Sequence, residues 1–225
     1  MKPEGGFGSA SFAPPPPVIT YTVVGICIAV QLVVAIGGSA FGDALAAHAG
    51  LIPARLTGVG LARAGDIPAV LTLVTSLFLH GGWLHLALNL SFLLWVGRHV
   101  ETVAGPERFA MLYLVSGVSG GLLQTAVEPG LISPVVGASG AIAGVFGAYA
   151  MLFARRRLAT RRILGVTVAG GVMTALWYLA TWVVLQLLTG LAFNQGGGGI
   201  AIWTHIGGFV VGLVAARWLV RRWAT

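Results

Sequence analysis

The chain has 225 residues, of which 57% are hydrophobic and only 8% are charged. Soluble domains contain about 25% charged residues, so this composition excludes an ordinary soluble protein and indicates an integral membrane protein. The net charge is +7, but the basic residues stand beside apolar runs and not together on one soluble face. We therefore expect a lipid bilayer, and no nucleic acid, as the partner.

The first 17 residues form a tail that cannot build a core. They are rich in Gly, Ser and Ala and end in four prolines at 14–17, a composition typical of a flexible and then stiff tether. We predict a Pro-rich tail over residues 1–17 and a membrane domain over 18–222. The first apolar run starts late and looks long enough to span, so it is expected to be a membrane span and not a cleaved signal peptide.

Six apolar runs along the chain predict an all-α membrane protein. The predicted spans cover residues 18–38, 83–97, 109–127, 138–154, 163–189 and 200–219. The second run is short, and the apolar stretch before it is expected to lie partly in the membrane interface. Together these spans use nearly the whole length, which leaves little room for a second domain.

The basic residues predict the orientation, because cytoplasmic loops carry an excess of Lys and Arg. With a cytoplasmic N-terminus, eleven of the 13 basic residues fall on the inner side, and only Arg55 and Arg63 fall on the outer side. Both termini are therefore expected in the cytoplasm, and residues 39–82 form a long external loop. The minimal core, without a targeting presequence, favours a bacterial plasma membrane.

Polar side chains inside membrane spans are costly and need a partner or a water-filled cavity. The predicted topology brings such residues from three distant segments to one depth near the outer surface: His80, His85 and Asn89, then Ser139, then Thr204 and His205. At about 1.5 Å per residue, Ser139 and His205 lie within roughly 10 Å of the outer ends of their helices. The three segments are therefore expected to meet.

Glycines next to these residues predict close helix packing. Small residues four positions apart let two membrane helices approach closely. The glycines that we expect to pack beside the site are Gly137, Gly140, Gly144, Gly208 and Gly212. Close contact between the fourth and sixth spans would bring the hydroxyl of Ser139 within hydrogen-bond reach of the His205 imidazole.

A serine hydroxyl becomes a good nucleophile when a base takes its proton, and His205 is the candidate base for Ser139. The oxyanion of the reaction then needs donors, for which the ring of His85, the amide of Asn89 and the backbone N–H of Ser139 at a helix N-terminus are suitable. No acidic residue lies in any predicted span, since outer loops contain Asp43, Asp66 and Glu128 and an inner loop contains Glu101 and Glu107. The pattern therefore predicts a Ser-His dyad.

Structural roles are the alternative for each of these residues. A lone serine between small residues often serves helix packing, and a lone histidine in a span often makes an interhelical hydrogen bond. Three histidines could also suggest a metal, but His80 and His85 are five apart on different helix faces, and no cysteine or carboxylate joins them. We expect neither a metal nor a cofactor.

Three motifs resemble the rhomboid family of intramembrane serine proteases. They are GASG at 137–140, HGGWLHLALN at 80–89 and HIGGFVVG at 205–212, on the fourth, second and sixth spans. GPERF at 105–109 also resembles the family's connection between the second and third spans. The resemblance implies a six-helix bundle that cleaves single-span membrane proteins in or near their membrane segment, with water from the outer side and without metal or ATP.

The same resemblance implies a role for each polar residue. Ser139 is the nucleophile, His205 is the general base, and His85 and Asn89 are oxyanion donors. His80 resembles a residue that organises the outer loop. A catalytically silent relative of the same fold, which binds or escorts membrane clients, is the alternative; a transporter would need inverted repeats and broken helices at mid-membrane, and the sequence has no such symmetry.

Two positions depart from the family pattern. Many rhomboids carry a Trp-Arg pair in the outer loop, where this chain has Leu71 and Thr72, so the loop is expected to be anchored differently. Some members stack an aromatic residue four positions after the serine on the catalytic histidine, where this chain has Ala143. The glycine-rich segment 193–199 is either a slack connector or, with a tilting fifth span, a cap that admits a substrate helix sideways.

Overall fold

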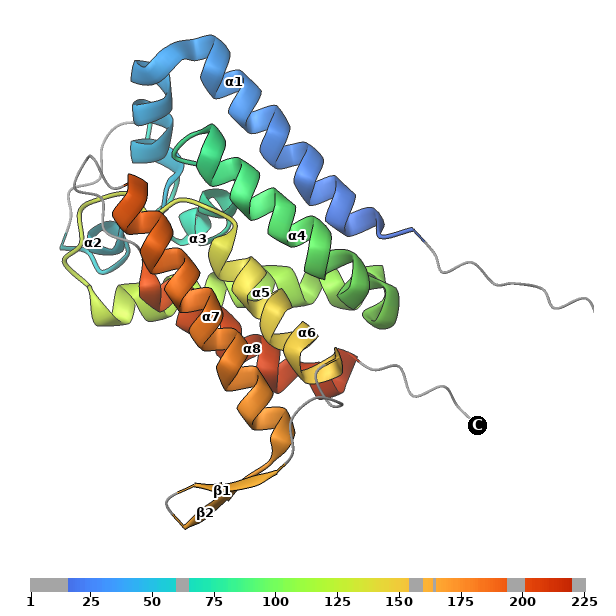
Figure 1. The fold of residues 1–225 in the computed structure, drawn as a ribbon. Helices are drawn as coiled ribbons and strands as arrows, with labels where there is room; N and C mark the ends of the chain where they lie inside the picture. The colour runs from blue at the N-terminus through green and yellow to red at the C-terminus, as the bar shows by residue number, and fades with distance from the viewer. Residues whose placement is uncertain (1–15, 60–64, 154–159, 164, 194–200, 220–225) are drawn as a thin grey trace, which may run out of the picture.

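The computed structural model describes residues 16–59, 65–153, 160–163, 165–193 and 201–219. Within these ranges the chain forms a bundle of six long helices (Figure 1). They are α1 (Val18–Ala49), α4 (Trp83–Ala104), α5 (Pro106–Val127), α6 (Ser139–Phe153), α7 (Gly170–Phe193) and α8 (Ile202–Leu219). Each long helix overlaps with one of the six apolar runs in the sequence.

Three of these helices, α1, α5 and α8, are long and apolar enough to cross a membrane. The pair Ala69–Phe78 and Trp83–Ala104, which is bent by 81°, makes a fourth if it is counted as one span. α6 is apolar but has only 15 residues. The described residues therefore contain three or four candidate spans, and six crossings with both termini in the cytoplasm remain a prediction.

α1 continues beyond the first predicted span. Gly38 adopts φ 80° and ψ 176°, a conformation that glycine reaches because it lacks a Cβ, and the helix turns back there (Figure 1). It then runs on to Ala49, so residues 39–49 of the predicted external loop are helical. The rest of that loop contains α2 (Pro53–Leu56), η1 (Ala69–Leu71), α3 (Thr72–Thr75) and η2 (Ser76–Phe78).

A two-stranded antiparallel hairpin stands where the sequence predicts the start of the fifth span. β1 (Arg161–Ile163) pairs with β2 (Val166–Val168), and Gly165 between them has φ 82°. α7 begins only at Gly170, so the predicted helix start at residue 163 is wrong. The β-branched residues of β2 favour a strand and make the apolar run ambiguous at this end.

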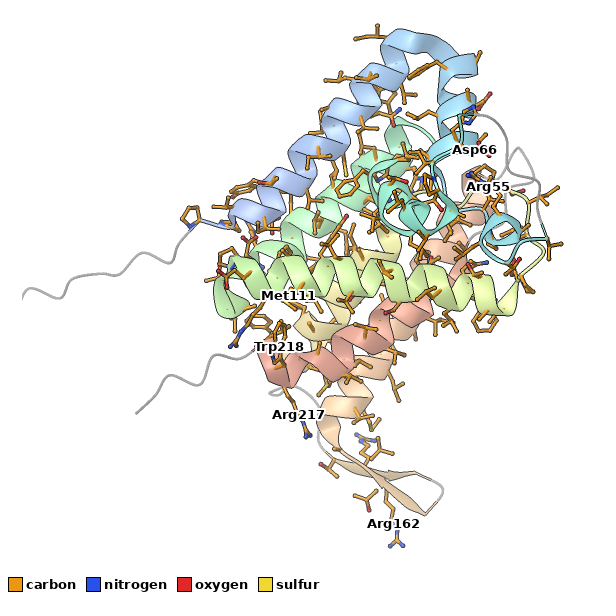
Figure 2. The ribbon with its side chains drawn as sticks, turned by 180° about the vertical axis from the view of Figure 1, so that it is seen from behind. Arg55, Asp66, Met111, Arg162, Arg217 and Trp218 are labelled. Atoms are coloured by element: carbon orange, nitrogen blue, oxygen red, sulfur yellow. The ribbon has the colours of Figure 1, made fainter. Side chains whose placement is uncertain are left out.

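The arginines labelled in Figure 2, one from the outer group and two from the inner group, lie at opposite ends of the fold. Arg55 lies beside Asp66 near α2, whereas Arg162 and Arg217 lie at the far end with the hairpin and the end of α8 (Figure 2). These are the groups that the sequence assigns to opposite sides of the membrane.

Glu101 caps the N-terminus of α1 from the last part of α4. Its carboxylate accepts the backbone N–H groups of Ile19 and Thr20, each at 2.8 Å, and the Thr20 hydroxyl at 2.7 Å. The first amides of a helix have no acceptor inside the helix, and Pro17 before it supplies no side-chain cap. The sequence placed Glu101 in an inner loop, because the apolar run 83–97 ends before it; the helix continues, and Glu101 is buried within it.

α6 lies at the centre of the bundle. It contacts α4, α5, α7 and α8, and eleven of its 15 residues are buried. Residues at the start of α6 are therefore enclosed by side chains from several helices.

Candidate active site

Ser139 is the first residue of α6 and is 7% exposed. The chain enters the helix through Gly137, whose φ of 128° favours glycine and whose N–H donates to the Ser76 carbonyl at 2.9 Å. The Ala138 carbonyl accepts the N–H of Ile142 at 2.9 Å, which starts the helix. The backbone N–H of Ser139 belongs to the first turn, where the helix itself supplies no acceptor.

His205 lies in the first turn of α8 and meets Ser139 directly. Its Nε2 is 2.7 Å from Ser139 Oγ, and both side chains are buried. The hydroxyl of Thr204 beside it donates to the carbonyl of Ala201, the residue just before α8, at 2.6 Å. The structure thus brings together two residues that are 66 positions apart in the sequence.

Glycines allow this contact, because α6 and α8 touch backbone to backbone. A Cβ at Gly208 would overlap the carbonyl oxygen of Gly140, and a Cβ at Gly212 would overlap that of Gly144. Gly144 also leaves no room for a side chain, since a Cβ there would overlap Ser116 of α5. The short helix separation that places the imidazole on the hydroxyl therefore depends on residues without side chains.

His85 turns one edge of its ring toward the serine. The N–H of Gly81 donates to His85 Nδ1 at 3.3 Å, so in the neutral ring the proton sits on Nε2. A Cβ placed at Gly137 would lie 2.9 Å from His85 Nε2 and 3.7 Å from Ser139 Oγ. The Nε2–H and the hydroxyl therefore border the same small space, which only glycine at position 137 leaves open.

Asn89 and His80 lie on either side of His85. Asn89 is buried one turn along α4, and one hydrogen of its Nδ2 goes to the His85 carbonyl at 2.8 Å; the second hydrogen of the amide is available for another acceptor. His80 precedes α4, is buried, and meets the ring of His85 edge-on at 5.2 Å and 70°. The structure therefore links the Asn89 side chain to the His85 backbone and the His80 ring to the His85 ring.

Trp182 of α7 is a neighbour of the site that the sequence does not predict. Its ring meets the His205 ring edge-on, with centroids 6.2 Å apart at 80°, and is 3% exposed. It also contacts Phe92 of α4 at 4.3 Å and Phe146 of α6 at 5.9 Å. One related signal in the sequence is Ala143 on α6, at the position where some rhomboids carry an aromatic residue that stacks on the catalytic histidine.

Residues 194–199 of the glycine-rich segment lie outside the described residues. Among the described residues, no three His, Cys, Asp or Glu side chains converge as metal ligands.

Comparisons with known proteins agree with the motifs. The model of the Rhomboid domain family matches residues 68–222. RHOMBOID-like protein 5 from Arabidopsis thaliana is 31% identical over 140 residues, which cover 62% of this chain and 41% of that protein. Rhomboid protease GluP from Bacillus subtilis is 32% identical over 144 residues, which cover 64% of this chain and 25% of that protein. The match thus spans less than half the length of either relative.

Proposed function

The chain belongs to the rhomboid family, and from this we propose that it is an intramembrane serine protease with Ser139 as nucleophile and His205 as general base. The observation that carries the proposal is the buried 2.7 Å contact between His205 Nε2 and Ser139 Oγ. A base at hydrogen-bond distance is what a serine needs in order to react at neutral pH. A second support is that one of the similar proteins, Rhomboid protease GluP, is itself named a protease.

The reaction follows from the atoms around the hydroxyl. His205 Nε2 takes the proton of Ser139 Oγ as this oxygen bonds to the carbonyl carbon of the substrate. His205 then gives that proton to the leaving nitrogen as the C–N bond breaks, and an acyl ester on Ser139 remains. Water deprotonated by His205 attacks the ester, which releases the carboxylic acid and returns the hydroxyl.

Three donors stabilise the oxyanion of this reaction. They are the backbone N–H of Ser139, the Nε2–H of His85 and the free hydrogen of the Asn89 amide. Such donors act strongly because they are fixed before the charge develops and are shielded from water. His80 orients His85 through its edge-on ring contact, and this is its proposed role in organising the outer side of the site.

A fluorophosphonate probe is the direct test of the nucleophile. We expect it to label Ser139 covalently, with fluoride leaving as Oγ bonds to phosphorus and His205 takes the proton. In His205→Ala the labelling rate is expected to fall at least about a hundredfold. Intact mass and peptide mapping measure this, and His99→Ala, which changes a histidine near the other end of α4, is the matched control. Labelling of another residue, or equal labelling in His205→Ala, would contradict the dyad.

Asn89→Ala tests the oxyanion donors. We expect kcat for a transmembrane substrate to fall about 10- to 100-fold with little change in KM, because the amide acts in the transition state. Thr125→Val is the control, since Thr125 is a buried residue of α5 that also bonds the carbonyl four positions earlier but lies outside the proposed donor set. An undiminished kcat in a folded Asn89→Ala would remove this residue from the proposed role.

Substrates are proposed to be single-span membrane proteins that enter sideways between α4 and α7. Trp182 of α7 closes this side against Phe92 of α4, and α7 packs less extensively on α8 than α6 does. A membrane helix hides its peptide bonds, so segments that unwind at Gly or Pro are favoured. We assign the site to the extracytoplasmic side of a plasma membrane, from the distribution of basic residues.

Linking the two sides of this entrance tests the gate. In a Cys27→Ser background, a short bifunctional thiol reagent joins Phe92→Cys to Trp182→Cys. Compared with the same variant before linking, we expect cleavage of a transmembrane substrate to fall at least about tenfold while fluorophosphonate labelling stays within about twofold. Each single cysteine variant with the same reagent is the control. Unchanged cleavage after complete linking would exclude this route.

A catalytically silent protein that binds membrane clients is the second candidate. It predicts that the protein retains a transmembrane client without cleaving it and that Ser139→Ala leaves this binding unchanged. The probe reaction distinguishes the two, since a silent relative leaves Ser139 unlabelled.

A further inference from the structure

Arg55, on the short helix α2, is a buried arginine in the outer loop. Its side chain and that of Asp66 are each 7% exposed, and the two lie together near α2 (Figure 2). Its Nη1 donates to the carbonyls of Ala47 and His48 at 3.1 and 3.4 Å, and its Nη2 donates to the carbonyl of Ile67 at 2.7 Å.

A network of Asp66 and His48 lies beside this guanidinium, whose buried Nε has no hydrogen-bond partner among the described residues. Asp66 Oδ2 is 3.4 Å from Arg55 Nη2, and Asp66 Oδ1 is 2.7 Å from His48 Nδ1. A buried arginine is tolerated when hydrogen bonds replace its water, and the planar fork of the guanidinium can reach two chain segments at once. Arg55 therefore joins the end of α1 to the segment that leads into η1.

The outer loop that contains Arg55 holds residues 129–137, the segment before the nucleophile. We call this segment the strap. Leu51 and Val135 exchange both backbone hydrogen bonds, at 3.1 and 2.7 Å. The N–H of Ala54 donates to the Leu131 carbonyl at 3.0 Å, and the hydroxyl of Thr57 donates to the Pro129 carbonyl at 2.9 Å. These contacts come from residues within four positions of Arg55.

The far end of the strap is held by the same loop. Gly137 donates its N–H to the Ser76 carbonyl at 2.9 Å, and the hydroxyl of the neighbouring Thr75 donates to the Ala49 carbonyl at 2.6 Å. Two residues after this clamp, Ser139 begins α6. The direction of the Ser139 N–H and the space at Gly137 are thus set by a strap whose partners Arg55 fixes.

We propose that Arg55, together with Asp66 and His48, is a positioning group that keeps the strap, and with it the oxyanion donors, in catalytic register. The inference rests on the proposed function, because its main readout is the reactivity of Ser139. Many rhomboids carry a Trp-Arg pair in the outer loop, at the positions of Leu71 and Thr72 in this chain. In this proposal Arg55 anchors the outer loop instead.

Arg55→Gln, Arg55→Lys and Asp66→Asn test the proposal in the full-length protein in lipid. The readouts are the rate of fluorophosphonate labelling of Ser139, and kcat and KM with a transmembrane substrate, all measured well below the unfolding temperature. We expect Arg55→Gln to lower the labelling rate and kcat at least about tenfold with KM within about twofold, because a small misplacement of donors slows chemistry more than binding. Arg55→Lys is expected to remain impaired, because a single ammonium does not reproduce the fork.

Asp43→Asn is the matched control, since Asp43 is an exposed carboxylate on the same extension of α1; it is expected to behave as the unchanged protein. A folded Arg55→Gln that is labelled and cleaves at the normal rate would overturn the proposal. So would full rescue by Arg55→Lys, which would reduce the role of Arg55 to its charge.

Amide hydrogen exchange supplies a readout that does not depend on catalysis, and Asp66→Asn supplies a milder change if Arg55→Gln fails to fold. We expect the amides of Val135 and Gly137 to exchange at least about tenfold faster in Asp66→Asn, because their acceptors lie on the loop that the network fixes. Unchanged exchange at both amides would refute the anchoring. If the unchanged protein is neither labelled nor active, the proposed function fails, whereas this exchange result still decides whether Arg55 and Asp66 hold the strap.

Discussion

Replacing Ser139 or His205 with alanine is expected to lower cleavage of a transmembrane substrate at least about a thousandfold and to leave the protein folded. The hydroxyl and the imidazole act as one unit across their 2.7 Å contact, so the double variant is expected to lose no more than either single one. Cleavage by purified protein in lipid vesicles, followed on gels and by mass, measures the effect.

Ser116→Ala is the matched control for the serine change. Ser116 is a fully buried serine of α5 beside Gly144, and it lies at the same helix junction without a proposed part in the reaction. We expect it to cleave within about threefold of the unchanged protein, as buried polar groups outside a mechanism affect stability more than chemistry. Cleavage at the normal rate by Ser139→Ala would end the proposed mechanism.

Gly208→Ala is expected to lower the stability of the protein strongly. The new Cβ would overlap the Gly140 carbonyl oxygen. Because the Cβ is fixed directly to the α8 backbone and the oxygen belongs to the α6 backbone, only separation of α6 from α8 relieves the overlap. We expect a loss of about 3 kcal/mol or more of unfolding free energy. The same separation draws His205 away from Ser139, so the folded fraction is expected to cleave about a hundredfold more slowly.

Gly25→Ala is the control for this change. Gly25 lies within α1, and a Cβ there would meet no atom within 4 Å. Alanine favours a helix over glycine by about 1 kcal/mol, so this variant is expected to be as stable as the unchanged protein or slightly more. Thermal unfolding in the same lipid or detergent compares the two, and equal stability of Gly208→Ala and Gly25→Ala would show that α6 and α8 do not rely on backbone contact.

The sequence predicts the meeting of α6 and α8 because the relevant information is local to each helix. Glycines four apart define a flat face on each helix, and Ser139 and His205 stand beside those faces at similar depth. The mutual position of His85 and Asn89 follows in the same way from their spacing on one helix. These features need only the helical period and the order of the apolar runs.

The features that the sequence does not predict depend on where elements end or how they pack. Glu101 was assigned to a loop, because the apolar run stops before it although the helix continues. Trp182 reaches His205 through the packing of α7 beside α6 and α8, which no spacing within α7 encodes. Arg55 lies in a loop without periodicity, where burial of a charge cannot be read from neighbouring residues. The hairpin is not predicted because the β-branched residues of β2 and the apolar sequence of α7 form one continuous apolar run, in which strand and helix cannot be told apart.

The contact between Glu101 and α1 also links the order of synthesis to the order of assembly. The ribosome makes Ile19 and Thr20 about 80 residues before Glu101, and N-terminal parts of a chain begin to fold first. The leading helix therefore inserts with its first amides still lacking their carboxylate and completes its end only when α4 emerges. A nascent chain arrested before residue 101 would leave the first amides of α1 without this cap, so the start of α1 is completed only after α4 has been made.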